Sequence, residues 1–475
     1  MKAYKIVIFI FSVIAALAVL CVIFPKDSIQ VGPWHWEFPS LTEVLESDKE
    51  DQAPEESPEE LLARRLRETR VKEESGYLQF LKSDPSRIQF PADNLKAWDE
   101  FFAALDNAGE KHLRILHYGD SQLEGDRMTS TLRRYLQQKF GGTGVGLLPL
   151  HQTVGAFTIG QSISPVPPRH LAYGPAELRS TSNRYGVMAQ VAHLTGGTAH
   201  ASFFPRGGKD SLDSHRYFTR LTVVAGNNSS TITAHCAGQS RSLAPTQGTG
   251  RLRFTLPDST TKVALSLSGS GDVYGVMLDS ETGVAVDNIP MRGCSGTMFT
   301  NINAAQLADF YKNENVRLII LQYGGNSVPY LKGDKSIETY ANQIARQIKH
   351  IRQQAPQAAV LFIGPSDMST RIKGKMQTYP ALPNIIAALK KAAHSEGAAY
   401  WDMYEVMGGH NSMAQWVKAQ PQLAGNDHIH FTRLGAERVG ELLSRSLLNT
   451  YEYYKWRMAD NTATAADSTQ TVNAQ

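Results

Sequence analysis

The first pattern along the chain is an apolar segment, Ile6 to Phe24, which follows Lys2 and Lys5. At a rise of about 1.5 Å per residue, a helix over this segment is nearly long enough to cross a hydrocarbon core of roughly 30 Å. We expect residues 1–25 to be a transmembrane signal anchor. A cleaved signal peptide is the alternative, although the run is longer than a usual signal-peptide core and no small-x-small cleavage site follows it.

Charges around this segment predict its orientation. Lysines precede it and an acidic segment follows, so the N-terminus is expected on the cytoplasmic side. We therefore expect a single-pass protein of a bacterial inner membrane whose remaining residues are periplasmic or extracytoplasmic. Residues 26–90 are polar and predict a stalk with one short helix, Pro58 to Lys72. Residues 451–475 predict a disordered tail, because Ala459 to Gln475 lacks apolar periodicity.

Short buried strands alternate with amphipathic helices in two blocks, residues 91–150 and 289–450. The predicted strands are Leu113 to Tyr118, Val316 to Gln322, Ala358 to Ile363 and Ala399 to Met403. The predicted helices are Leu95 to Asn107, Asp126 to Phe140, Ile337 to Gln354, Ile385 to Glu396 and Arg433 to Leu448. This alternation is typical of a three-layer α/β fold, in which helices cover both faces of a parallel sheet.

Residues 151–288 have a different pattern. Gly, Ser, Thr and Pro separate short runs such as RLTVVAG, TITAHC, RLRFTL and KVALSLSG. Runs of this length and spacing are typical of an all-β sandwich. We therefore expect a β-sandwich domain inserted into the α/β domain.

Composition narrows the possible functions. The chain has 475 residues, 42% of them hydrophobic and 20% charged, and a net charge of +3 from 48 basic and 45 acidic residues without a long basic tract. Nucleic acid is therefore not an expected partner. The three cysteines, Cys21, Cys236 and Cys294, do not have metal-ligand spacing, and we expect no metal or other cofactor. Cys236 and Cys294 fit either a disulfide or two free thiols.

A serine follows the first predicted strand directly, in Gly119-Asp120-Ser121. A tight turn from a strand into a helix exposes a hydroxyl where backbone N–H groups favour a developing anion. Helix capping by Asp120 or Ser121 is the alternative interpretation of the same residues.

The segment before the last predicted helix contains Asp427 and His430. An Asp three residues ahead of a His can accept its Nδ1–H and leave Nε2 to take a proton from a serine. His430 is therefore the candidate base. We expect a solvent-exposed or capping role for its neighbour His428.

Two further segments supply candidate oxyanion donors. Asn326 follows the strand Val316 to Gln322, and Gly293 follows the last strand pattern of the inserted region. An amide side chain and a glycine N–H are both suited to stabilise an oxyanion. Gly293 is the less specific candidate, since Gly283 and Gly296 lie nearby.

In this order, the Ser, Gly, Asn and Asp-x-x-His blocks resemble those of the SGNH/GDSL hydrolase superfamily over residues 110–150 and 288–450. The resemblance implies a flavodoxin-like α/β fold. It also implies that Ser121 is the nucleophile, Asp427 and His430 complete the triad, and Ser121, Gly293 and Asn326 form the oxyanion hole. The chain departs from the family's usual G-x-N-D block at Ser327, where Asp is common.

The anchor and the inserted β region make the chain similar to peptidoglycan O-acetylesterases of this superfamily. The resemblance implies a serine esterase that removes O-acetyl groups from an envelope glycan such as peptidoglycan. Two alternatives stay open. One is an O-acetyltransferase of envelope polysaccharide that works with a membrane acyltransferase partner, and the other is a non-catalytic envelope glycan-binding protein.

Overall fold

The computed structural model describes residues 3–24, 29–31, 34–36, 39–40, 42, 58–207 and 213–472. Two compact units make up the chain, Met1–Glu74 and Ser75–Gln475. The first contains helix α1 (Ala3–Ile23), the two-stranded sheet of β1 (Ile29–Val31) and β2 (Trp34–Trp36), and the beginning of helix α3 (Pro58–Ser83). Within α1, the segment Tyr4–Ile23 is long and apolar enough to cross a membrane, a property that signal sequences share.

The stalk prediction is only partly covered by the structure. Residues 43–57 lie outside the described residues. Helix α3 begins at Pro58 as expected but ends at Ser83 instead of Lys72. Near this end Leu81 is buried, which gives the second half of the helix an apolar anchor.

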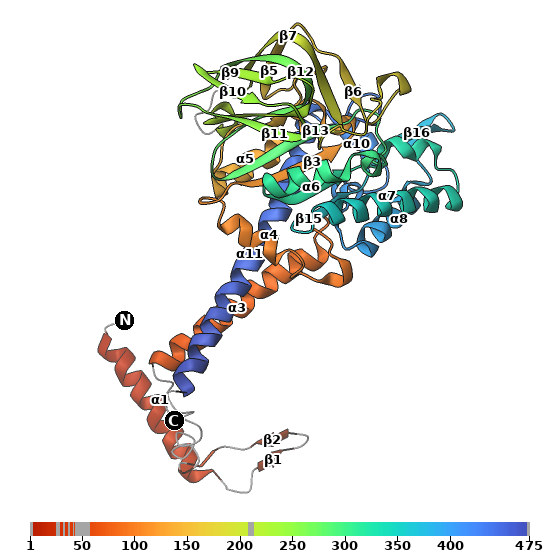
Figure 1. Cartoon of the computed structure of the whole chain (residues 1–475). Helices are drawn as coiled ribbons and strands as arrows, with labels where there is room; N and C mark the ends of the chain where they lie inside the picture. Colours follow the sequence, from red (N-terminus) through yellow and green to blue (C-terminus); the bar gives the residue numbers. More distant parts are fainter. Residues whose placement is uncertain are drawn as a thin grey trace. The chain divides into compact units, whose positions relative to one another are not determined.

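A five-stranded parallel sheet forms the centre of the second unit (Figure 1). Its strand order is β13 (Val284–Pro290), β3 (Leu113–Gly119), β14 (Val316–Gln322), β15 (Ala359–Ile363) and β18 (Ala399–Trp401). Gly119 at the end of β3 pairs with Pro290 of β13 and with Gln322 of β14. The carboxyl ends of these three strands are therefore level, and the loops that follow them start at one edge of the sheet.

Side chains along β3 alternate between two cores. Leu116 and Tyr118 pack in one core, which contains residues of α6 (Ala304–Asn313), α7 (Asp334–Gln354) and α8 (Leu382–Ser395). Leu113 and Ile115 pack in the other, with residues of α4 (Asp99–Asp106), α5 (Thr129–Phe140) and α11 (Arg433–Val472). This two-residue period buries both faces of the sheet, so the predicted three-layer α/β fold is confirmed.

The smaller elements of this part of the unit lie in the connections that follow β15 and β18. They are the hairpin of β16 (Ser369–Ile372) and β17 (Lys375–Thr378), and the short helices α9 (Met403–Met407) and α10 (Ser412–Lys418).

The inserted region forms a nine-stranded antiparallel sheet, whose strands gather at one end of the unit in Figure 1. Its strands are β4 (Gly146–Leu148), β5 (Ile159–Ser164), β6 (Arg169–Leu171), β7 (Gln190–Pro205), β8 (Arg220–Asn228), β9 (Ile232–Cys236), β10 (Gln239–Leu243), β11 (Thr246–Thr255) and β12 (Val263–Asp279). Strand β12 pairs with β4, β7, β8 and β9. A third apolar core lies within this sheet. Because both sheets belong to one compact unit, a separate β-sandwich domain stays a prediction.

Both junctions of the insertion differ from the expected residues 151–288. Strand β4 already pairs with β12 and so belongs to the antiparallel sheet, whereas β13 pairs in parallel with β3 and belongs to the central sheet. The sequence does not separate β12 from β13, because both are apolar runs divided by a short turn.

Helix α11 continues well past the predicted end at Leu448. Tyr451, Tyr453 and Tyr454 are buried, and the ring of Tyr454 lies 5.5 Å from that of Phe102. These aromatic contacts place residues 451–458 in the folded unit and not in a disordered tail. Residues 473–475 of the predicted tail lie outside the described residues.

Candidate active site

Ser121 lies directly beyond the end of β3. The Asp120 carboxylate accepts a hydrogen bond from the Gln122 N–H at 3.0 Å and caps a short 3-10 helix, Ser121–Asp126. Gly119 has no room for a side chain, since a Cβ would lie 2.7 Å from Leu123 Cδ1. The close approach of Leu123 thus requires glycine at this position, and Ser121, the next residue but one, is half-buried at the sheet edge. The α-helix that follows begins at Thr129, slightly later than the sequence predicts.

His430 lies in the loop between α10 and α11. Asp427 shapes this loop, because its Oδ1 accepts hydrogen bonds from the N–H groups of Ile429 and His430, both at 3.0 Å. His428 has a positive φ of 56° within the turn. Its Nδ1 is buried without a hydrogen-bond partner among the described residues, and the ring that reaches the serine is that of His430.

The structure joins the three predicted triad residues in one hydrogen-bonded chain. Ser121 Oγ lies 2.8 Å from His430 Nε2, and His430 Nδ1 lies 2.7 Å from Asp427 Oδ2. Partial burial favours the protonated form of Asp427, but hydrogen bonds from the His430 ring and from two backbone N–H groups keep its pKa below the usual value. An ionised Asp427 holds the Nδ1–H tautomer and leaves Nε2 as the acceptor for the serine proton.

Asn326 lies in the short helix Gly325–Tyr330 after β14 and faces the serine turn. Its Nδ2 donates to Asp120 Oδ2 at 3.1 Å and to the carbonyl oxygen of Cys294 at 3.3 Å. Burial raises the pKa of Asp120 to about 6, against hydrogen bonds from Gln122 and Asn326 and the nearby His430. Both N–H groups of the Asn326 amide are thus engaged within the protein.

Gly293 lies in the loop after β13, exposed and with a φ of 72°. It lines a cavity of about 530 Å³ together with Ser121, Asn326 and His430. This cavity, the serine cavity, also has walls from the loop after β15, including Pro365 and Met368. The four predicted segments therefore meet at one opening above the carboxyl edge of the parallel sheet.

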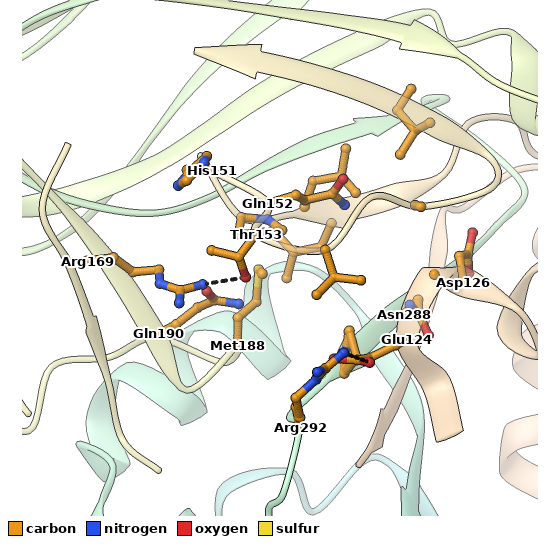
Figure 2. Close-up of a pocket in the computed structure, with 18 of the residues that line it drawn as sticks. Glu124, Asp126, His151, Gln152, Thr153, Arg169, Met188, Gln190, Asn288 and Arg292 are labelled. Atoms are coloured by element: carbon orange, nitrogen blue, oxygen red, sulfur yellow. Dashed lines mark hydrogen bonds and ion pairs between the residues drawn. The ribbon is translucent and has the colours of Figure 1, made fainter. Parts of the chain in front are cut away.

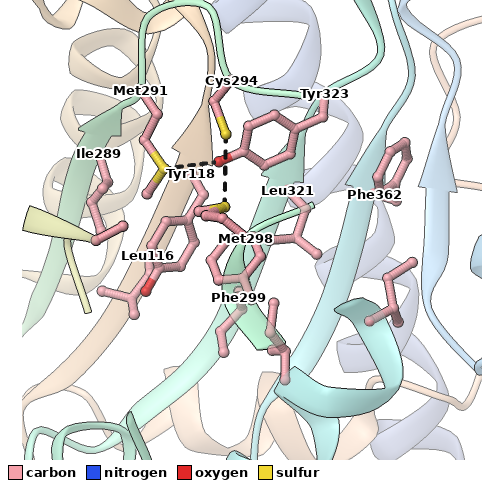
Figure 3. Packing of buried hydrophobic residues seen from close by; sticks show 14 of the residues in the cluster. Leu116, Tyr118, Ile289, Met291, Cys294, Met298, Phe299, Leu321, Tyr323 and Phe362 are labelled. Carbon is pink, nitrogen blue, oxygen red and sulfur yellow. Dashed lines mark hydrogen bonds between the residues drawn. The ribbon is translucent and has the colours of Figure 1, made fainter. Parts of the chain in front are cut away.

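Residues on both sides of Gly293 pack into a buried cluster of sulfur and aromatic groups, which holds its loop in place (Figure 3). The Tyr323 hydroxyl lies 3.4 Å from the sulfur of Met291, and Cys294 Sγ lies 3.7 Å from the sulfur of Met298. Of the two interpretations of the cysteines, the structure shows free thiols, since Cys236 and Cys294 are both buried and unpaired.

Two residues connect the serine turn to the histidine loop and were not predicted from the sequence. Gln122 Nε2 donates to the Ile429 carbonyl at 2.7 Å, and Gln122 Oε1 accepts from the Phe431 N–H at 3.2 Å. Arg127 donates to the carbonyl oxygens of Ser121 and Phe431, at 2.7 and 3.0 Å. The histidine-loop partners of Gln122 and Arg127 lie more than 300 positions away in the sequence. The local sequence therefore does not predict these contacts, and the fold is needed to identify them.

Residues 255–438 match the GDSL-like lipase/acylhydrolase family, a segment that includes Gly293, Asn326, Asp427 and His430 but not Ser121. A solved structure described as a peptidoglycan O-acetylesterase is 20% identical with a TM-score of 0.61, and the alignment covers 75% of this chain and 96% of that one. An acetyl xylan esterase is 14% identical, with a TM-score of 0.26 and coverage of 34% and 79%.

A family two carbohydrate esterase from Cellvibrio japonicus is 12% identical, with a TM-score of 0.25 and coverage of 62% and 99%. Among curated proteins, no sequence matches the chain significantly. The family match, together with the three-layer fold, confirms the predicted resemblance to SGNH/GDSL hydrolases, and the match to an acylhydrolase family supports the prediction of an esterase.

Proposed function

We propose that this chain is a serine esterase that removes O-acetyl groups from a cell-envelope glycan such as peptidoglycan. The observation that carries the proposal is the hydrogen-bonded series Ser121, His430 and Asp427, which opens into the serine cavity. In this arrangement a hydroxyl, a base and an orienting carboxylate have the mutual geometry of nucleophilic acyl transfer.

In the proposed mechanism His430 Nε2 takes the Ser121 proton while Oγ attacks the acetyl carbonyl carbon. The resulting tetrahedral anion collapses to an acetyl-serine, and the protonated His430 gives its proton to the departing sugar hydroxyl. Water then attacks the acetyl group with His430 as the base, which releases acetate and restores Ser121. Asp427 keeps the imidazole in the required tautomer and stabilises the imidazolium.

The oxyanion would accept hydrogen bonds from the Ser121 N–H, the Gly293 N–H and the Asn326 amide. Because Asn326 donates to Asp120 and Cys294 in the free site, one of these bonds must be exchanged for the bond to the oxyanion. Each such donor contributes about 3 kcal/mol to transition-state stabilisation.

The fold that this chain shares with a peptidoglycan O-acetylesterase supports the substrate class. The apolar helix α1 supports a location at the outer face of a bacterial inner membrane, with α1 as the anchor and the second unit extracytoplasmic. An O-acetylated envelope glycan would be within reach of an enzyme held there.

The test uses the full-length chain in detergent with p-nitrophenyl acetate, O-acetylated peptidoglycan and acetylated xylan. We expect hydrolysis of the small ester to fall by at least about 10³-fold in Ser121→Ala and in His430→Ala. Acetate release should be fastest from peptidoglycan. The control is His428→Ala, which alters the same loop but leaves the Ser121–His430 pair in place, and should keep most of the activity.

Two outcomes would contradict the proposal in different ways. If Ser121→Ala hydrolyses p-nitrophenyl acetate as fast as the wild type, Ser121 is not the nucleophile. If the small ester is hydrolysed in a Ser121-dependent way but xylan releases acetate faster than peptidoglycan, the mechanism holds and the glycan is wrong.

A further inference from the structure

A second cavity of about 380 Å³ lies beside the serine cavity, between the parallel sheet edge and the antiparallel sheet (Figure 2). We call it the side cavity. Glu124 and Arg292 line both cavities. Arg292 donates to the two carboxylate oxygens of Glu124 at 2.6 and 2.5 Å, so one ion pair stands at the boundary between the cavities. A ligand larger than an acetyl group could extend past this boundary.

The lining of the side cavity has an excess of positive charge. It contains three arginines and two carboxylates. Arg133 is neutralised by Asp126 at 2.7 Å, and Arg292 by Glu124. Arg169, on strand β6, donates to the Thr153 hydroxyl at 3.2 Å, and no carboxylate pairs with it in the part of the chain that the structure describes. Its guanidinium is therefore available to an anionic ligand group.

The wall also holds a polar atom that lacks a partner. Gln190, the first residue of β7, is only 8% exposed, and its Oε1 has no hydrogen-bond partner among the described residues. Strand pairing places Gln190 opposite Leu171, two residues from Arg169. A buried carbonyl oxygen without a donor is costly, and a ligand N–H or O–H would satisfy it.

We infer that the side cavity is a second substrate site, which binds a carboxylate-bearing substituent of the glycan next to the acetylated sugar. Arg169 binds the carboxylate, and Gln190 Oε1 accepts a hydrogen bond from an N–H or O–H of the same substituent. The inference rests on the proposed function and narrows its substrate to acidic O-acetylated glycans. It also gives the antiparallel sheet a role, because β6 and β7 supply both residues.

The test compares one substrate in two charge states. O-acetylated peptidoglycan fragments are used as isolated, or after their carboxylates have been converted to methyl amides. The full-length chain is compared with Arg169→Gln, Arg169→Lys and Gln190→Leu, and with Arg241→Gln as a matched control at an exposed arginine of the same sheet. Hydrolysis of p-nitrophenyl acetate measures the serine cavity alone, because this ester is too small to reach Arg169.

We expect the wild type to prefer the carboxylate form by about 10-fold or more in kcat/KM, mainly through KM. Arg169→Gln should abolish this preference, Arg169→Lys should keep part of it, and Gln190→Leu should raise KM for both forms. All variants should hydrolyse p-nitrophenyl acetate at the wild-type rate.

The inference is overturned if the wild type does not distinguish the two forms, or if Arg169→Gln prefers the carboxylate form as strongly as the wild type and Arg241→Gln do. Ser121-dependent hydrolysis of the small ester would persist in either case, so the proposed esterase mechanism would stand. Loss of that Ser121 dependence would contradict the proposed function itself.

Discussion

Replacing Asp427 by Asn should impair hydrolysis more than replacing it by Ala. Asp427 Oδ1 accepts from the backbone N–H groups of Ile429 and His430, while Oδ2 faces His430 Nδ1 at 2.7 Å. An Asn side chain would keep its oxygen on the two backbone donors. Its NH₂ group would then donate a hydrogen bond to His430 Nδ1. Because Nδ1 must accept this bond, the imidazole proton moves to Nε2. That tautomer cannot take the Ser121 proton.

The expected loss of rate follows from the hydrogen bond between Asp427 and His430. A hydrogen bond to a charged group contributes about 1.5–3 kcal/mol, or roughly 10- to 150-fold in rate. The Asp427 side chain is 49% exposed, so solvent screening places the loss in Asp427→Ala toward the lower end of that range. Asp427→Asn adds the cost of the wrong tautomer, and we expect a loss on the order of 10²–10³-fold.

The assay is kcat/KM for p-nitrophenyl acetate at neutral pH, with thermal unfolding of each variant to verify the fold. Asp427→Ala is the matched control, because it removes the charge without imposing a tautomer. If Asp427→Asn is as active as Asp427→Ala or more active, the orientation of His430 by Asp427 is not what sets the rate, and the proposed role of Asp427 is wrong.

Three further predictions concern polar groups that are buried or partly buried in the second unit. Arg114 is fully buried against Asp279 and Asp287, so Arg114→Met should lower the free energy of unfolding in urea by about 3–5 kcal/mol, and a loss under about 1 kcal/mol would contradict this. Asn326→Ala should lower kcat for p-nitrophenyl acetate by about 10²–10³-fold with little change in KM, and an unchanged kcat would exclude Asn326 as an oxyanion donor. The folded-state pKa of Asp120 is raised from 3.8 to about 6, so the native state binds more protons between these values and unfolding free energy should fall as pH rises through this window. Asp120→Asn should flatten that slope, and an equal slope in both proteins would show that Asp120 does not titrate there.

The central sheet could be predicted because its strands are short, continuous apolar runs buried on both faces. The sequence pattern places most of strand β13 in the insertion, because a run such as VAVDNIP is equally typical of a parallel and of an antiparallel sheet. The extension of α11 was missed for a related reason. Tyr451 and Tyr454 pack against Phe102 of α4, a contact that the local pattern does not contain.

In the candidate site, too, local sequence predicts some residues, whereas others depend on tertiary packing. Ser121 follows a strand in a tight turn, and Asp427 and His430 lie within one short motif, so local sequence predicts them. Gln122 and Arg127 act through backbone carbonyls and N–H groups of a distant loop. The side cavity needs both sheets in place before Arg169 and Gln190 line one wall. Such contacts depend on tertiary packing and produce no periodic pattern along the sequence.

The most direct test of the central claim is to identify the residue that becomes covalently modified. The full-length chain is treated with diethyl p-nitrophenyl phosphate, which traps activated serines, and the label is located by peptide mass spectrometry. Ser121 should carry the label in the wild type, and labelling should be strongly slowed in His430→Ala. A label on another residue that abolishes ester hydrolysis, or hydrolysis that persists in Ser121→Ala, would contradict the assignment of Ser121 as the nucleophile.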